Sequence, residues 1–252
     1  MRRVFYLGIT IIISSLLSSC TTTPIKNPIY LPKEIYPQPT GSVLRQDVFH
    51  TVAPGETLWR ISKIYDVPMQ NILQANSLEN KEELGKGQRL LIPNAAPVMP
   101  VISLYPSEKW RYIIIHHSAT DKGSSLSFDK AHLLRGWDGV GYHFVIDNGT
   151  KGKDDGQIEV SPRWLNQENG SHCKAGSMNT KAIGICLVGD FSREVPTSRQ
   201  MDALVYLVNR LRKYYRIPMS RIMGHGQVPG AKTECPGKNF PWRGLKSRLT
   251  AK

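Results

Sequence analysis

The fold is decided by a short apolar run, Tyr112-Ile113-Ile114-Ile115-His116, in which three β-branched residues lead into a histidine. A continuous apolar run of this length predicts a buried strand, because β-branched side chains pack well on a pleated surface. The strand would deliver the imidazole of His116 to the edge of a sheet. His117 follows directly, and consecutive strand residues point to opposite faces. At most one of these two histidines can therefore readily join a site on one face.

A second stretch places two further metal-ligand side chains on one loop. Residues 224–237 read Gly-His-Gly-Gln-Val-Pro-Gly-Ala-Lys-Thr-Glu-Cys-Pro-Gly and contain His225 and Cys235. Two His and one Cys suit zinc, and three protein ligands with one open position are typical of a catalytic zinc site. We therefore predict a zinc hydrolase in which His116, His225 and Cys235 bind Zn²⁺.

Strand and helix patterns alternate around these two stretches. We expect strands over residues 111–117, 142–147, 183–189 and 221–223, and helices over residues 126–136 and 198–215. Thr197 and Gln200 form a predicted capping box at the start of the last helix. Alternation of this kind predicts an α/β domain with a mixed central sheet flanked by helices.

The N-terminus has the pattern of an export signal. Arg2 and Arg3 precede an apolar stretch over residues 4–17, which is shorter than the ~20 residues that a membrane-spanning helix needs. Small residues then lead to Cys20, as at a cleavage site. Plain secretion with an incidental cysteine is the alternative to lipid attachment.

The end of this signal, Leu17-Ser18-Ser19-Cys20, resembles the lipobox of bacterial lipoproteins. The resemblance implies that residues 1–19 are removed and that Cys20 carries the lipid anchor. Thr21, which is not acidic, implies by the same resemblance an outer-membrane location facing the periplasm. Residues 20–46 contain five prolines with little apolar periodicity and are predicted to be an extended tether.

Residues 47–94 form a compact unit with the predicted order strand, helix, helix, strand. Thr57 is a predicted N-cap, and Pro68 opens the second helix. The unit resembles a LysM domain in sequence. The resemblance rests on the segment His50-Thr51-Val52-Ala53-Pro54-Gly55-Glu56-Thr57-Leu58, on Asn76 and on residues 84–93. The resemblance implies binding to N-acetylglucosamine-containing glycans such as peptidoglycan. A packing module without a ligand is the alternative. Residues 95–104 are a predicted linker to the larger domain at 105–252.

The larger domain resembles the type 2 family of zinc N-acetylmuramoyl-L-alanine amidases, which includes phage-lysozyme-type amidases and peptidoglycan recognition proteins. The resemblance rests on five segments in order: residues 115–120, residues 139–144, Gly170-Ser171-His172, residues 183–189 and the loop from His225 to Gly237. It implies that His116, His225 and Cys235 are the zinc ligands and that Tyr142 assists at the metal-bound water or the oxyanion. It also implies that His172 lies near the substrate groove.

The chain departs from parts of the family at two positions. The phage branch has a catalytic lysine two residues before the cysteine ligand, where this chain has Thr233, and Lys232 lies one place earlier. Both residues are therefore candidates for a catalytic role. Other branches have a glutamate where this chain has Cys186, so the catalytic role falls to Tyr142. Peptidoglycan or muropeptides are the implied substrates.

The amino-acid composition excludes few classes of function, but the charge balance limits the kinds of binding partner that we expect. The formal net charge is +13 over 252 residues, and loss of Arg2 and Arg3 with the signal lowers it to +11. A basic balance favours anionic surfaces such as phospholipid headgroups or acidic wall polymers, and a merely solvated basic surface is the alternative. We predict no nucleic-acid partner, because the chain is exported and has no dense Lys/Arg run. We expect a monomer.

Two alternative functions and the pairing of two cysteines stay open at this point. A zinc-free recognition lipoprotein that only binds peptidoglycan is one alternative. A wall cysteine peptidase that uses Cys173 beside His172 is the other, although Cys173 does not open a helix as an activated thiolate would. Cys173 and Cys186 could form a disulfide in an oxidising compartment, or remain buried free thiols.

Overall fold

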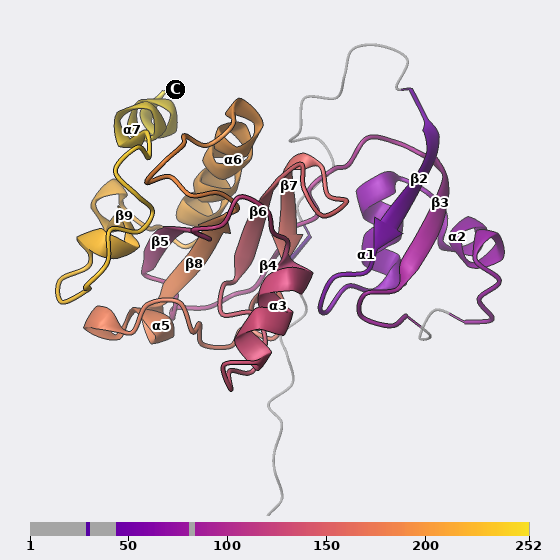
Figure 1. Ribbon diagram of the computed structural model, residues 1–252, viewed down its shortest axis with the longest axis horizontal. Coiled ribbons are helices and arrows are strands. Elements are labelled where there is room, and N and C mark those ends of the chain that lie inside the picture. The colour runs from indigo at the N-terminus through magenta and orange to yellow at the C-terminus, as the bar shows by residue number, and fades with distance from the viewer. Residues whose placement is uncertain (1–28, 31–43, 81–83, 252) are drawn as a thin grey trace, which may run out of the picture.

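The computed structural model describes residues 29–30, 44–80 and 84–251 and contains a small and a large unit that lie side by side (Figure 1). The small unit holds β2, α1, α2 and β3, and the large unit holds the elements from β4 to α7. The predicted signal peptide, Cys20 and nearly all of the predicted tether lie outside the described residues. Within the described residues, no helix has both the length and the apolar character that a bilayer crossing requires.

The small unit has the predicted order of strand, helix, helix, strand, namely β2 (Gln46–Thr51), α1 (Leu58–Tyr65), α2 (Met69–Ala75) and β3 (Arg89–Ala95). The two strands pair antiparallel. Thr57 caps α1 as predicted, because its hydroxyl accepts a hydrogen bond from the amide of Arg60. Asn76 ties α2 to β3, since its side-chain amide donates to the carbonyls of Ile72 and Leu91 and its oxygen accepts from the amide of Leu91.

The large unit is built on a five-stranded mixed sheet with the strand order β7-β6-β8-β5-β9. The strands β5, β8 and β9 run parallel to one another, β6 runs parallel to β8, and β7 is antiparallel to β6. Their bounds are β5 (Tyr112–His117), β6 (Phe144–Asn148), β7 (Asp155–Val160), β8 (Ala182–Leu187) and β9 (Ile222–Gly224). This arrangement confirms the predicted α/β class with a mixed central sheet.

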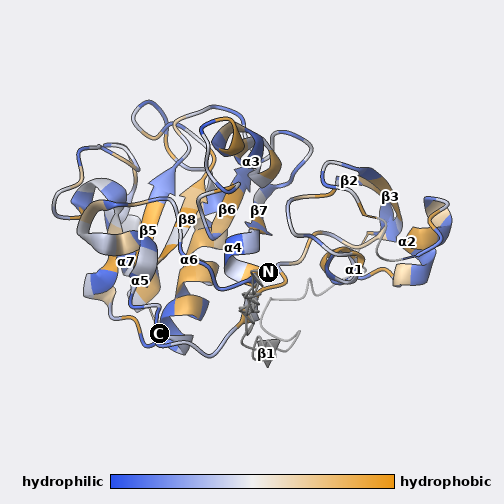
Figure 2. Ribbon diagram, turned by 90° about the horizontal axis from the view of Figure 1, so that it is seen from below, coloured by the Kyte–Doolittle hydropathy of each residue, from blue (hydrophilic) through white to orange (hydrophobic). Residues whose placement is uncertain are grey.

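Helices cover both faces of the sheet, which is apolar between them (Figure 2). One face packs on α6 (Ser198–Tyr214) and α7 (Trp242–Thr250) through residues such as Ile113 and Ile115. The other face is covered by α3 (Ser125–Leu133) and α5 (Met178–Lys181), and the short α4 (Pro162–Leu165) follows β7. Because strand residues alternate, His117 lies on the α6 face with Ile113 and Ile115, whereas His116 lies on the opposite face with Ile114.

The element boundaries differ from the prediction in several places. The predicted strand from residue 142 begins only at Phe144, so Tyr142 lies in the loop before β6. The predicted helix over 126–136 ends at Leu133. The long helix has the predicted capping box, in which Thr197 and Gln200 exchange side-chain to backbone hydrogen bonds. The strand β7 and the helix α7 were not predicted.

Residues 95–104, the predicted linker, are packed against both units. The amide of Met99 donates to the carbonyl of Ile64 in the small unit. Further along, Ile102 and Leu104 are buried in the core of the large unit. β4 (Ser103–Leu104) pairs with β1 (Ile29–Tyr30), so this segment is also a site of strand pairing.

The two units contact each other through ionic groups that converge on β7 and α3. Lys153 is buried, lies 3.1 Å from the carboxylate of Glu159 and donates to the carbonyl of Thr51 in the small unit. On α3, the carboxylate of Asp129 accepts from Lys86 of the small unit at 2.7 Å. A buried lysine needs such partners, because an unpaired buried charge is strongly unfavourable. The small unit is therefore held directly on the large one.

Candidate metal centre

Three potential metal ligands meet at the carboxyl edge of the parallel strands. His116 lies near the end of β5, and His225 follows the last residue of β9. These two strands are neighbours, with Ile115 paired to Gly224, so the residues that follow them come together. The ring centroids of His116 and His225 are 4.8 Å apart. Cys235 joins them from the loop that the sequence singled out.

The loop from His225 to Cys235 is closed by a backbone hydrogen bond near its two ends. The amide of Gly226 donates to the carbonyl of Cys235 at 2.7 Å. A Cβ atom at Gly226 would lie only 2.4 Å from the carbonyl oxygen of Thr233. A larger residue at position 226 would therefore push the start and the end of the loop apart. Glycine at this position therefore allows His225 and Cys235, ten places apart in the sequence, to face one ion.

The donor set fits zinc in both chemistry and spacing. One ligand atom from each of His116, His225 and Cys235 lies within 4.8 Å of the others, and the Sγ of Cys235 is 3.7 Å from the Nδ1 of His116. Tetrahedral zinc, with Zn–N of about 2.0–2.1 Å and Zn–S of about 2.3 Å, separates its ligand atoms by roughly 3.3–3.7 Å. Small movements of these side chains would complete that geometry.

The electrostatic surroundings keep both imidazoles neutral, as metal ligands must be. Burial and the neighbouring His172 and His225 lower the pKa of His116 well below its ordinary value. Burial also lowers the pKa of His225. In the metal-free chain, burial raises the pKa of Cys235 to about 12, although the amide of His117 acts in the opposite direction. Zinc binding would therefore displace the thiol proton.

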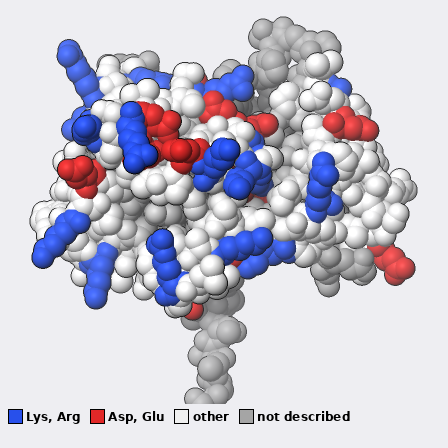
Figure 3. Space-filling model, viewed as in Figure 1, with Lys and Arg blue, Asp and Glu red and all other residues white. Residues whose placement is uncertain are grey.

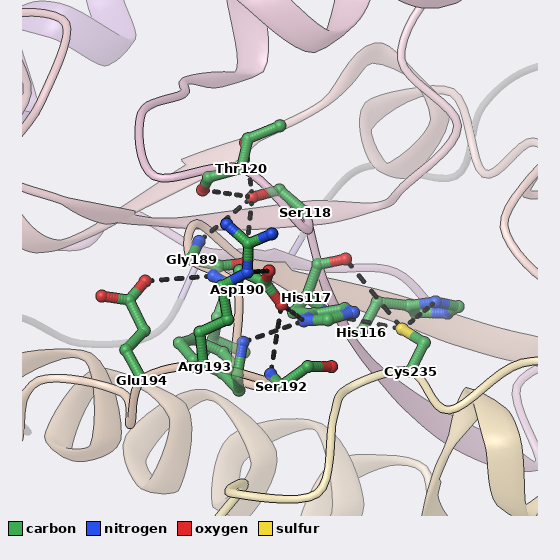
Figure 4. A network of polar contacts seen from close by, with 12 residues as sticks. His116, His117, Ser118, Thr120, Gly189, Asp190, Ser192, Arg193, Glu194 and Cys235 are labelled. Carbon is green, nitrogen blue, oxygen red and sulfur yellow. Dashed lines mark hydrogen bonds and ion pairs between the residues drawn. The ribbon is translucent and has the colours of Figure 1, made fainter.

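The backbone of β5 supports the sulfur directly. The amide of His117 donates to the Sγ of Cys235 at 3.4 Å. The side chain of His117 turns away, toward the loop with Asp190, and its Nδ1 accepts from the amide of Phe191 at 3.0 Å (Figure 4). The structure thus uses His116 and not the imidazole of His117 at the candidate centre, in keeping with the strand alternation.

Tyr142 lies beside the candidate centre although it precedes β6. Its ring centroid is 5.3 Å from that of His116, and the rings of Phe128 and His132 flank it at 6.4 and 5.8 Å. Burial, followed by the charges that Cys186 and Cys235 would carry, raises the pKa of Tyr142 well above its ordinary value. The phenol therefore stays protonated near neutral pH and can donate a hydrogen bond.

The other predicted site residues occupy different positions around the centre. Thr233 is exposed, and its hydroxyl accepts from the amide of Cys235 at 3.2 Å. Lys232 is exposed on the same loop. His172 is buried, and the Nε2 of His116 lies 3.0 Å from its Nδ1. Contact of Thr233, Lys232 or His172 with substrate stays a prediction.

The cysteines that the candidate centre does not use are buried thiols. Cys173 and Cys186 are both free, which resolves the pairing that the sequence left open. Burial raises the pKa of Cys173, so this thiol lacks the thiolate character that a cysteine peptidase requires. Cys186 of β8 is paired with Val145 of β6 and lies near Tyr142. Burial raises the pKa of the Cys186 thiol well above its ordinary value.

Comparison with known proteins places both units in families. The fold and the candidate centre define an α/β protein with three potential metal ligands at the carboxyl edge of a mixed sheet. The family model described as N-acetylmuramoyl-L-alanine amidase matches residues 106–238, and the LysM domain model matches residues 50–93. Because the first match spans more than half of the chain, the chain belongs to the N-acetylmuramoyl-L-alanine amidase family, and it carries a LysM domain.

Individual relatives come from animals, phages and bacteria. Peptidoglycan-recognition protein LB of Drosophila melanogaster is 35% identical over 137 residues, which are 50% of this chain and 54% of that protein. The endolysin of Enterobacteria phage K11 is 33% identical over 131 residues, which are 48% of this chain and 77% of the endolysin. The solved N-acetylmuramoyl-L-alanine amidase LysC from Clostridium intestinale URNW is 34% identical, covers 58% of this chain and 90% of its own, and has a TM-score of 0.47. The chain spans about half the length of the first curated relatives that it matches.

Proposed function

We propose that this protein is a zinc-dependent peptidoglycan amidase that hydrolyses the amide bond between N-acetylmuramic acid and L-alanine. One observation carries the proposal: His116, His225 and Cys235 converge beside Tyr142, within the residues that the amidase family model matches. The LysM unit supports a glycan substrate, because its family match lies beside the catalytic unit on the same chain. Intact wall and soluble muropeptides both contain this bond.

The residues of the centre have distinct tasks in this proposal. The chemistry that zinc would supply here is to lower the pKa of a bound water toward 7 and to polarise the substrate carbonyl. His116, His225 and the thiolate of Cys235 would hold the ion. Because one thiolate neutralises one charge, the centre would keep a formal charge of +1. The phenol of Tyr142 would donate a hydrogen bond to the carbonyl oxygen as negative charge develops on it.

Hydrolysis of a defined muropeptide tests the proposal. Mass spectrometry should detect a free muramic acid carboxyl group and a peptide with a free N-terminal alanine. Activity should disappear with a chelator such as 1,10-phenanthroline and return on addition of Zn²⁺, with the non-chelating 1,7-phenanthroline as the matched control. Activity that ignores the chelator would contradict zinc dependence. Binding of the muropeptide without any cleavage would instead favour the peptidoglycan recognition alternative.

We also propose that Cys20 anchors the protein to the outer membrane, facing the periplasm. The support is the apolar N-terminal stretch that ends in Leu17-Ser18-Ser19-Cys20. Metabolic labelling with an alkyne-bearing fatty acid should tag the wild-type chain and leave Cys20→Ala unlabelled. Fractionation should recover the wild type with outer-membrane proteins. A labelled Cys20→Ala variant would contradict the assignment of this cysteine.

On the face that Figure 3 shows, the distribution of charge supports a dispersed interaction with an anionic wall or membrane. Lys and Arg side chains are spread over the face in Figure 3, with Asp and Glu side chains between them. This face carries no single basic patch. After removal of the signal, the formal charge of +11 would act as a general attraction that salt would screen.

A further inference from the structure

A second histidine lies directly behind the candidate zinc ligand His116. The Nδ1 of His172 is 3.0 Å from the Nε2 of His116, and the Nε2 of His172 is 3.3 Å from the backbone carbonyl oxygen of Ala182. His172 is buried, with only 7% of its surface exposed. Both nitrogens of its ring are thus engaged by protein groups, although 56 residues separate it from His116.

The hydrogen bonds define the tautomer of each ring in turn. A carbonyl oxygen only accepts, so the Nε2 of His172 must carry its proton and donate to Ala182. A neutral imidazole has one N–H, and burial favours the neutral form, so the Nδ1 of His172 is an acceptor. The Nε2 of His116 must then be the donor. This leaves the Nδ1 lone pair of His116 free, on the side where the Sγ of Cys235 lies at 3.7 Å.

The ring of His172 lies in a slot that two glycines make possible. A Cβ atom at Gly170 would be 2.3 Å from the Cδ2 of His172, and one at Gly184 would be 2.4 Å from the same atom. Neither glycine has a positive φ. Space for the ring, and not backbone conformation, therefore requires glycine at both positions.

The backbone on either side of the ring is also fixed. The side-chain oxygen of Asn179 accepts from the amides of His172 and Cys173, at 2.8 and 2.7 Å. The slot, the Asn179 contact and the carbonyl of Ala182 together leave the Nδ1 of His172 pointing at His116.

We infer that His172 is a positioning residue that fixes His116 in the tautomer whose Nδ1 faces the metal. This inference rests on the zinc site of the proposed function. Without the acceptor, His116 can carry its proton on Nδ1, and that proton must then move to Nε2 before Nδ1 can bind zinc. Loss of a hydrogen-bond partner behind a histidine ligand typically weakens metal binding by about 10- to 100-fold.

Zinc affinity, measured on the full chain by competition with a chelator of known affinity, tests the inference. His172→Leu should weaken zinc binding by about 10- to 100-fold. His172→Asn keeps an acceptor oxygen near the position of Nδ1 and should recover most of the loss. Equal affinity in wild type and His172→Leu, or an equal loss in the Leu and Asn variants, would overturn the inference.

Two further variants separate positioning from general stability. His143→Asn is the matched control, because His143 is buried beside His172 but bonds to the amide of Gly184 and the carbonyl of Glu168. It should lower the thermal midpoint of the metal-free chain and leave zinc affinity unchanged. Gly184→Ala keeps every histidine but displaces the His172 ring, and it should weaken zinc binding. Unchanged affinity in folded Gly184→Ala would count against the inference.

The tautomers can also be observed directly by long-range ¹H–¹⁵N NMR of the histidine rings. In the metal-free wild type, both His116 and His172 should carry their proton on Nε2. A proton on the Nδ1 of His172 would overturn the inference. A wild type that binds no zinc would overturn the proposed function instead, and these metal-free spectra would then decide the inference alone.

Discussion

Replacement of Tyr142 by phenylalanine is expected to leave zinc bound and to lower kcat by about 10²- to 10³-fold, the usual effect of removing one oxyanion donor. The variant keeps the ring, which packs among His116, Phe128 and His132. It loses only the hydroxyl, whose pKa burial raises, so that the wild type presents a donor. Metal content by mass spectrometry and kcat on a defined muropeptide are the measurements.

Tyr214→Phe provides the matched control for this experiment. Tyr214 lies on α6, on the opposite face of the sheet from His116, and packs against Tyr215. Its hydroxyl should be dispensable for the reaction, so we expect kcat to stay at the wild-type value. Full activity in Tyr142→Phe would remove the phenol from the mechanism.

Replacement of Cys235 by alanine is expected to remove bound zinc and to lower kcat/KM by at least about 10³-fold, which corresponds to roughly 4 kcal/mol of transition-state stabilisation. The thiolate is the only charged ligand among the three, and its loss leaves two neutral imidazoles. Zinc per chain after dialysis against buffer with a weak chelator measures the first effect, and muropeptide hydrolysis measures the second.

Cys173→Ala is the decisive companion variant. Cys173 is buried in an apolar cluster with Ile114 and Val228, so this substitution should retain both zinc and activity. A cysteine peptidase built on Cys173 and His172 predicts the reverse pattern, with Cys173→Ala inactive and Cys235→Ala active. The two variants therefore separate the zinc amidase from its closest chemical rival in one assay.

The elements that carry the candidate centre could be predicted because their signals are local. Three consecutive isoleucines identified β5, and strand alternation separated His116 from His117. Thr197 and Gln200 marked the start of α6 through side chains that satisfy its first amides. The βααβ order of the small unit was likewise predicted, from an N-cap at Thr57 and the proline at 68.

The strand β7 could not be predicted because its local sequence is typical of a turn and its burial depends on tertiary contacts. Asp154, Asp155 and Gly156, with φ at +81° for the glycine, are typical of a turn. The strand also contains Glu159, a buried carboxylate that pairs with Lys153 and accepts a hydrogen bond from the amide of Ser125. The helix α7 was missed for a different reason, since Pro241 provides no side-chain hydrogen bond at its start.

The contact between the rings of His116 and His172 could not be predicted from the sequence either. The family resemblance implied a place for His172 near the substrate groove, and no periodicity connects two histidines in different elements. Their contact depends on the parallel pairing of β5 with β8 and on the absence of side chains at Gly170 and Gly184. Such close approaches become visible only when three-dimensional distances are known.

The direct contact between the LysM unit and the large unit fixes the position of one relative to the other. Lys153 joins β7 to Thr51, and Lys86 joins the small unit to Asp129 on α3. Asp129 also accepts from the amide of Val140, two residues before Tyr142. Under the proposed function, a glycan strand held by the LysM unit would meet the catalytic centre at one fixed offset and orientation. The enzyme would then cleave stem peptides at a fixed distance along the glycan strand from the site that the LysM unit holds. Defined glycan oligomers that carry stem peptides should therefore be cleaved at a preferred sugar position.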